Sequence, residues 1–198
     1  MMIGIIGRIY LRNRFAFLSN FVFRSECYIF QNNQFTNVVN MTTGKISASS
    51  VTQDQDLLIF GGDQKNDAPS TSIEKVSISS QSSKVIGQMP FHFAFGCVLK
   101  YGQNDIIAIG GQQNGSISSA TWTSSLKNLN NWSPGPNLKQ TRELMGCGVL
   151  PELKLAIVTG GSKGRFILGN QDRLSSTELI RLDEKMDEKK VKKGKIRG

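Results

Sequence analysis

The single histidine and the three cysteines limit the chemistry that this chain could perform. His92 is the only histidine in 198 residues, so a Ser-His-Asp triad could form only around it, and a site with several histidine ligands is excluded. Cys27, Cys97 and Cys147 form no CxxC pair, and their odd number implies neither a zinc site nor a closed set of disulfides. We expect Cys97 and Cys147 to be small buried apolar residues. The sequence thus predicts no catalytic residue, no metal and no cofactor.

Two single residues are candidates for contact with a partner. His92 lies where the chain enters an apolar run, PFHFAFG, and its ordinary role there is packing or a loop hydrogen bond. Arg142 precedes the apolar run LMGCGVL. Its guanidinium could brace a turn through backbone carbonyls, or it could bind an acidic partner.

A third candidate is the segment 162–176, SKGRFILGNQDRLSS. It places Arg165, Phe166 and Arg173 close together in the sequence. Apolar residues flanked by cations suit contact with a protein, because binding residues concentrate in loops on a rigid frame. A solvated insertion is the alternative interpretation.

The net charge of +9 belongs to the two ends of the chain. Residues 1–24 account for +4 and residues 183–198 for +3, which leaves +2 for residues 25–182. A nearly neutral body indicates no specific binding of nucleic acid. Arginines interrupt the uncharged N-terminal runs before they reach the ~20 residues that a membrane helix needs, so no membrane span is predicted. The cellular compartment stays unknown.

Two further sequence features carry little functional information by themselves. The Lys-rich segment 183–198 predicts a disordered tail, and a nuclear-localisation signal or a contact with an acidic surface is the alternative. Three N-x-S/T triplets begin at Asn40, Asn114 and Asn131. A chain this rich in Asn, Ser and Thr contains about that many by chance, so the triplets alone do not indicate secretion.

Three apolar runs that end in a pair of glycines mark an internal repeat: LLIFGG (57–62), IIAIGG (106–111) and LAIVTGG (155–161). The first glycines of the pairs are 49 and then 50 residues apart. A second landmark keeps this period, since FGCVL at 95–99 returns as MGCGVL at 145–150. Two landmarks in one register indicate a repeated structural unit.

Each unit is predicted to be a small antiparallel sheet. A short polar turn separates the two apolar runs, which is hairpin spacing and too short for a parallel crossover. Third strands are predicted at 72–78, 118–126 and 175–182, and a weaker fourth strand surrounds Trp132. Four antiparallel strands in about 50 residues, without helices, are typical of one blade of a β-propeller.

These residues resemble the kelch-repeat family, whose blades combine a double glycine, a glutamate in the next strand, a tryptophan in the outer strand and an arginine before the following blade. The matching residues are Gly61, Gly62, Gly110, Gly111, Gly160 and Gly161 for the glycines, Glu74 and Glu178 for the glutamate, Trp132 for the tryptophan and Arg142 for the arginine.

The resemblance covers residues 25–182 and implies a partial kelch-type β-propeller of four-stranded antiparallel blades, all-β in class. It begins with an outer half-blade in which Glu26 and Phe35 take the Glu and Trp places, and about three blades follow. Residues 1–24 form a basic segment outside it. The middle unit departs from the family pattern, with Ala120 at the glutamate place and His92 at the arginine place.

The resemblance implies a non-enzymatic module that presents rim loops to a protein partner. An enzyme acting on a sugar or small molecule is one alternative, although the chain is poor in histidines and in clustered carboxylates. A structural arc that self-associates is another, because the predicted strands are too few to close a propeller. We expect such an open arc to be a fragment, or to pair with a second copy.

Overall fold

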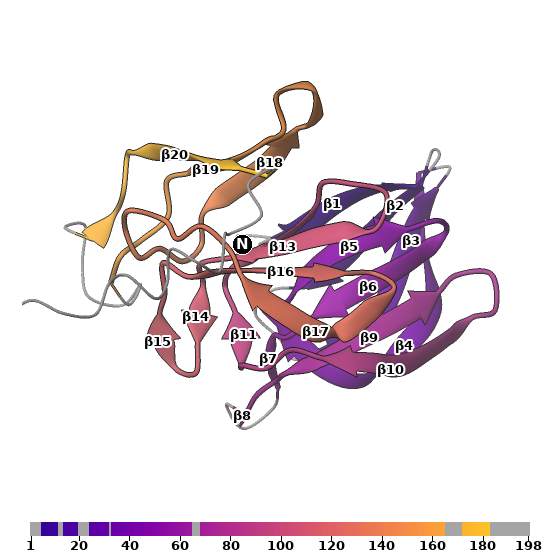
Figure 1. Cartoon of the computed structure of the whole chain (residues 1–198). Helices are drawn as coiled ribbons and strands as arrows, with labels where there is room; N and C mark the ends of the chain where they lie inside the picture. Colours follow the sequence, from indigo (N-terminus) through magenta and orange to yellow (C-terminus); the bar gives the residue numbers. More distant parts are fainter. Residues whose placement is uncertain are drawn as a thin grey trace, which may run out of the picture.

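The described part of the chain is built from β-strands and turns. The computed structural model describes residues 5–11, 14–19, 24–31, 33–64, 68–164 and 172–182 (Figure 1). The described residues include a 3-10 turn, η1 (Pro151–Leu153). None of the described residues forms a helix long and apolar enough to cross a membrane. The prediction of an all-β fold is confirmed.

The first sheet begins in the N-terminal segment that the sequence places outside the repeat. Its main strands are consecutive antiparallel neighbours: β1 (Ile5–Leu11), β2 (Arg14–Ser19), β3 (Arg24–Gln31) and β4 (Gln34–Ile46). The hairpin of β3 and β4 corresponds to the predicted outer half-blade. The basic segment therefore adds two strands to this sheet.

Two further sheets have four antiparallel strands, and the fourth sheet of the stack has three; the short strands β11 (Phe93–Ala94), β14 (Gln112–Gln113) and β15 (Ser116–Ile117) form a separate three-stranded sheet. The second sheet contains β5 (Ser49–Gln53), β6 (Asp56–Phe60), β9 (Ser72–Ser77) and β10 (Ser82–Gln88). The third contains β12 (Cys97–Lys100), β13 (Asp105–Ile109), β16 (Thr121–Ser125) and β17 (Asn128–Pro134). The fourth contains β18 (Gly146–Leu150), β19 (Leu155–Thr159) and β20 (Thr177–Arg181). The strands before each double glycine and after it lie where the sequence predicts them.

The four sheets stack in chain order, with an apolar core in each gap. Side chains alternate between the two faces of a strand, so a central strand serves two cores. On β6, Leu57 and Ile59 face the first sheet, whereas Leu58 and Phe60 face the third. On β13, Ile106 packs with the second sheet and Ile107 with the fourth. Continuous apolar runs before the glycines are therefore needed, because these strands are covered on both sides.

Trp132 of β17 lies in the gap between the second and third sheets. Its ring meets Phe60 and Phe91 edge to face, with centroids 6.3 Å apart in both cases. Its indole N–H donates to the Leu129 carbonyl at 2.8 Å. The tryptophan is thus satisfied inside the molecule and packs one sheet against the next.

The fourth sheet stands at the end of the stack (Figure 1). One face, with Ala156 and Val158 of β19, packs on the third sheet. The opposite face carries Leu150 and Leu179, which are 37% and 59% exposed. Among the described residues no fourth strand pairs with this sheet.

At the first two double glycines the chain lies close to the segment that enters the next sheet. Gly61 has a φ of +62°, and a side chain there would collide with the carbonyl oxygen of Phe93, at the entry to the third sheet. Gly110 has a φ of +53°, and an added Cβ would lie 2.8 Å from the Arg142 carbonyl oxygen. Both features require glycine. Backbone hydrogen bonds cross the same places, from Gly62 N–H to Phe93 O and from Gly111 N–H to Arg142 O.

Candidate functional site

Arg142 is buried and binds inside its own sheet. One guanidinium nitrogen donates to the carbonyls of Gly160 and Ser176, at 2.8 and 3.1 Å. The other donates to the Ser176 hydroxyl at 3.0 Å and to the Glu178 carboxylate at 2.6 Å. The side chain has no exposed surface. Of the two roles open to Arg142 in the sequence, the structure therefore shows the structural one, and a partner could not reach this residue. We call this arrangement the Arg142 clamp.

Glu178 is ionised more readily than an isolated glutamate. Burial acts to raise the pKa of its carboxyl, but the backbone N–H of Lys139 and the Arg142 guanidinium stabilise the carboxylate more strongly, so the pKa is lowered. The Lys139 N–H lies 2.6 Å from the second carboxylate oxygen. Glu178 thus joins the end of the third sheet to the fourth.

A second clamp, which the sequence did not predict, joins Lys45 at the end of β4 to β9 of the second sheet. Lys45 donates to the Ser72 hydroxyl at 2.7 Å and lies 3.5 Å from the Glu74 carboxylate. Both charged side chains are at most 1% exposed. Burial lowers the pKa of Lys45, and the charge of Glu74 opposes that shift. Glu74 also accepts from Thr42 N–H on the first sheet and from the Ser83 hydroxyl.

The Lys45 clamp and the Arg142 clamp occupy equivalent places. Ser72 and Ser176 both accept the N–H of the first glycine of a pair, and in each case the glutamate follows two residues later. Lys45 and Arg142 both lie two residues before a non-glycine residue with positive φ, Ser47 or Leu144. The feature common to both places is thus a cation two residues before the positive-φ residue, and it can be a lysine or an arginine.

In the third sheet the same positions carry aromatic residues. Gly110 N–H donates to Ala120 O, so Ala120 matches Ser72 and Ser176, and Trp122 is at the glutamate place. Phe93, two residues before the positive-φ residue Phe95, is at the arginine place. The prediction that Ala120 is at the glutamate place was therefore wrong by two residues, and the prediction that His92 is at the arginine place was wrong by one.

Gln113 takes over the polar role in this third clamp. Its amide nitrogen donates to the carbonyls of Gly110 and Ala120 at 3.1 and 3.2 Å, the positions that match the two carbonyls bound by Arg142. Its amide oxygen accepts the Trp122 indole N–H at 3.1 Å. Trp122 also lies against Phe91, with ring centroids 5.0 Å apart.

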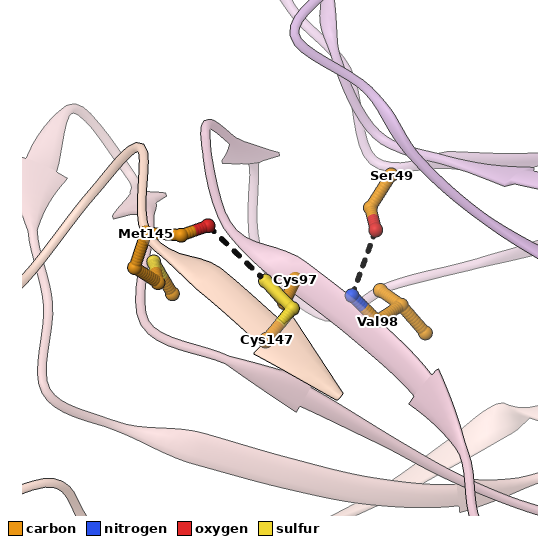
Figure 2. Close-up of a disulfide and its surroundings, with 5 residues drawn as sticks. All are labelled: Ser49, Cys97, Val98, Met145 and Cys147. Atoms are coloured by element: carbon orange, nitrogen blue, oxygen red, sulfur yellow. Dashed lines mark hydrogen bonds between the residues drawn. A yellow bond between two sulfur atoms is a disulfide. The ribbon is translucent and has the colours of Figure 1, made fainter. Parts of the chain in front are cut away.

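Cys97 and Cys147 form a disulfide between β12 of the third sheet and β18 of the fourth (Figure 2). Both were expected to be small buried apolar residues; Cys97 is buried and Cys147 half-buried, but the sequence did not predict the bond between them. Cys97 pairs across its hairpin with the residue just before the double glycine, whereas Cys147 pairs with the residue two before it. A step of one residue turns a side chain to the other face of a strand. The two sulfurs can therefore meet in the gap between the sheets.

A hydrogen bond takes the place of the disulfide one gap earlier. Ser49 matches Cys97 in register, and its hydroxyl accepts the Val98 N–H at 2.7 Å (Figure 2). Val98 matches Cys147 in the same way. The inner strands β5 and β12 are thus joined by a hydrogen bond, and β12 and β18 by a covalent bond at the equivalent place.

Directly after each double glycine the chain forms a small hairpin at one rim of the stack. The first is β7 (Asp63–Gln64) with β8 (Ala68–Pro69), the second is β14 (Gln112–Gln113) with β15 (Ser116–Ile117), and in the third Ser162 bridges to Arg173. Each pairs with the segment that enters its sheet: the end of β4, β11 (Phe93–Ala94) and Glu143. We call these three elements the rim hairpins.

The rim hairpins are joined to one another along the chain. Phe93 N–H donates to Ser70 O, beside the first hairpin. Gln112 of the second donates to the buried Glu143 carboxylate at 2.7 Å, beside the third. In Figure 1 the first two lie along the lower edge of the stack, at β7, β8, β14 and β15. Hydrogen bonds thus link the described parts of neighbouring rim hairpins.

Two of the candidate contact residues are exposed at the rim hairpins. His92 adjoins the second rim hairpin, where its backbone N–H donates to the Asn114 side-chain oxygen at 3.0 Å. Arg173 is exposed on the third. Arg165 and Phe166 belong to the tip of the third hairpin by sequence and lie outside the described residues, as does the tail 183–198.

The described residues contain no group of three or more His, Cys, Asp or Glu side chains that could hold a metal ion. Compared with protein-family models, the chain matches none, and comparison with curated proteins also gives no match.

Proposed function

We propose that this chain is a kelch-type protein-interaction module. In this proposal each four-stranded sheet is a propeller blade, and the rim hairpins bind a protein partner. One observation carries the proposal: a clamp binds the same backbone positions in the third and fourth sheets and an ion pair recurs in the second and fourth, whereas the sequences of the hairpin tips differ in length and chemistry.

The kelch assignment is supported by the clamps. A buried cation before one sheet binds a glutamate on the third strand in the Lys45 and Arg142 clamps, as the family pattern of arginine and glutamate implies. The contacts of Gly61 and Gly110 support a structural role for the double glycine, because both residues lie beside the segment that enters the next sheet. A solenoid of flat sheets would not need the same close approach at a fixed point.

The partner-binding role is supported by how the charged residues are used. Lys45, Glu74, Arg142 and Glu178 are all bound to one another or to backbone groups, which leaves the rim hairpins as the variable part. Their tips read KND at 65–67, NG at 114–115 and RFILGNQ at 165–171. Binding residues concentrate in such loops on a rigid frame.

The third tip suggests the chemistry of the partner. It combines Phe166, Ile167 and Leu168 with Arg165, and Arg173 is exposed beside it. An apolar anchor surrounded by cations fits a protein surface with an apolar pocket and an acidic border.

The test is a pull-down with three forms of the full chain. The rim variant carries Arg165→Ser, Phe166→Ser and Arg173→Ser. The control carries Lys84→Ser, Val85→Ser and Lys127→Ser, which removes the same number of cations and of apolar side chains from exposed positions on β10 and in the turn between β16 and β17. Mass spectrometry should identify proteins that the native chain and the control retain and the rim variant loses. If no protein depends on the rim in this way, the proposal is wrong.

A further inference from the structure

The tip of the second rim hairpin is an exposed N-x-S triplet. Asn114 and Gly115 form the two-residue turn between β14 and β15, with φ values of +51° and +81°, the conformation for which Asn-Gly is favoured. Asn114, Gly115 and Ser116 are all exposed. A Cβ added at Gly115 would meet no atom within 4 Å. There is room here for a large group on the asparagine.

The side chain of Asn114 is held through its oxygen, which leaves the amide nitrogen outside the hydrogen bond to His92. The side-chain oxygen accepts the His92 N–H at 3.0 Å, and the Asn114 backbone N–H donates to the His92 carbonyl at 3.2 Å. Within the described ranges no acceptor is bound to the amide nitrogen of Asn114. A substituent on that nitrogen would leave both bonds to His92 intact.

The disulfide is an independent observation about the environment of the chain. Disulfides form and persist in oxidising compartments and are rare where thiols are kept reduced. The Cys97–Cys147 bond joins two sheets of the core. The third cysteine, Cys27, is buried, and burial with the charges of Glu74 and Glu26 raises its thiol pKa to about 12. A thiol that stays protonated and covered does not exchange with the disulfide.

We infer that Asn114 is the acceptor of an N-linked oligosaccharide and that the chain folds in the oxidising lumen of a secretory pathway. The donor is an oligosaccharide attached to a lipid through a pyrophosphate. The amide nitrogen forms a bond to the anomeric carbon, the bond from that carbon to the pyrophosphate oxygen breaks, and its electron pair leaves with the lipid pyrophosphate. One amide proton passes to the transferase.

The other two triplets differ from this one in their setting. Asn40 and Asn131 are exposed, but both lie within strands, β4 and β17. Their middle residues, Met41 and Trp132, pack into the gaps between sheets. Acceptor triplets belong to surface loops, and among the three only that of Asn114 is a turn.

The decisive experiment uses the protein isolated from its own cells, with free thiols alkylated at lysis. Glycosidase treatment in heavy-oxygen water converts a glycosylated asparagine into labelled aspartate. We expect mass spectrometry to find the label at Asn114, together with a peptide that links Cys97 and Cys147 before reduction. An unlabelled Asn114 would overturn the assignment of the acceptor, and alkylated Cys97 and Cys147 would overturn the assignment of the compartment.

A pair of variants separates glycosylation from other causes of labelling. Ser116→Ala removes the triplet but keeps Asn114 and its bonds to His92, and Ser116→Thr keeps the triplet. In cells that process the native chain, the label should disappear in Ser116→Ala and persist in Ser116→Thr. A label that survives in Ser116→Ala would show spontaneous deamidation instead, and the inference would be wrong.

Discussion

The guanidinium of Arg142 lies 2.6 Å from the carboxylate of Glu178, and no part of the arginine side chain reaches the surface. Arg142 precedes the first strand of its sheet and Glu178 lies on the third, so the pair closes the sheet across 36 residues of sequence. Removing one member of such a pair is costly, because Glu178, whose side chain is only 11% exposed, would lose its charged partner with little water to replace it.

Arg142→Met should therefore destabilise the chain by about 3–5 kcal/mol, the usual cost of breaking a buried ion pair. The measurement is the free energy of unfolding in urea. Arg173→Met is the control, because Arg173 is exposed, and its change should be close to zero. In the double variant Arg142→Met, Glu178→Met the loss should be smaller than the sum of the single losses. Additive losses would contradict the pairing.

The contribution of the same pair should disappear in acid. The pKa of Glu178 is lowered in the folded chain from its ordinary value of 4.5. As the pH falls toward that ordinary value, the unfolded chain therefore takes up a proton at Glu178 before the folded chain does. Stability present above that pH is lost as the pH falls through the folded-state pKa. Glu178→Gln should be less stable at neutral pH and should lose less on acidification. Parallel pH profiles for the two proteins would refute this.

The two glycines Gly110 and Gly160 should respond differently to alanine. Both have positive φ, but the added Cβ lies 2.8 Å from a carbonyl oxygen at Gly110 and 3.6 Å from the nearest atom at Gly160. Both variants bear the strain of the left-handed backbone. Gly110→Ala should lose roughly 1–3 kcal/mol more, because it also overpacks a contact between sheets. Gly115 also has a positive φ, but a Cβ added there would meet no atom within 4 Å. Gly115→Ala therefore measures the cost of the backbone conformation alone. Equal losses at 110 and 160 would contradict the close approach.

Reduction should weaken the fold substantially. Cys97 and Cys147 close a loop of 50 residues, for which the chain-entropy account gives about 4 kcal/mol of stabilisation. Urea unfolding with and without a reductant measures the difference. The double variant Cys97→Ser, Cys147→Ser should be insensitive to the reductant. If the native chain is insensitive as well, the bond does not contribute to stability.

The exposed face of the fourth sheet should cause self-association. Leu179 is 59% exposed there, and apolar faces of this kind rarely stay uncovered in a monomer. Sedimentation of the native chain should show mass increasing with concentration, and Leu179→Lys should reduce that increase. Val85→Lys is the control, because Val85 is 48% exposed on a different sheet. A native chain that stays monomeric at micromolar concentration would rule this out.

The sequence was most informative where one residue type is required by geometry. The double glycines predicted the strands before and after them, because few other residues tolerate a positive φ beside a neighbouring carbonyl. Glu74, Glu178 and Arg142 stood out because they occupy the glutamate and arginine places of the kelch-repeat pattern. Lys45 was not predicted because the kelch-repeat pattern has an arginine at this place, although a lysine also donates to a hydroxyl and a carboxylate.

The errors came from counting residues across a turn of variable length. The hairpin of β18 and β19 has one residue more than that of β12 and β13, so the two cysteines, 50 residues apart, differ by one step in register. Spacing alone therefore placed them on the same face. Trp122 was hidden in the same way, because the segment between the double glycine and the third strand also varies in length. Hydrogen-bond partners are needed to fix such equivalences.

The bond between Cys97 and Cys147 also determines what a protease would leave behind. The turn at Asn114 and Gly115 is an exposed tip, the kind of place where chains are nicked, and it lies inside the loop that the two cysteines close. A single cut there would produce two polypeptides held together as one particle, with the clamps still in place. The mass of the nicked protein would stay almost unchanged until the disulfide was reduced, when the two pieces could separate.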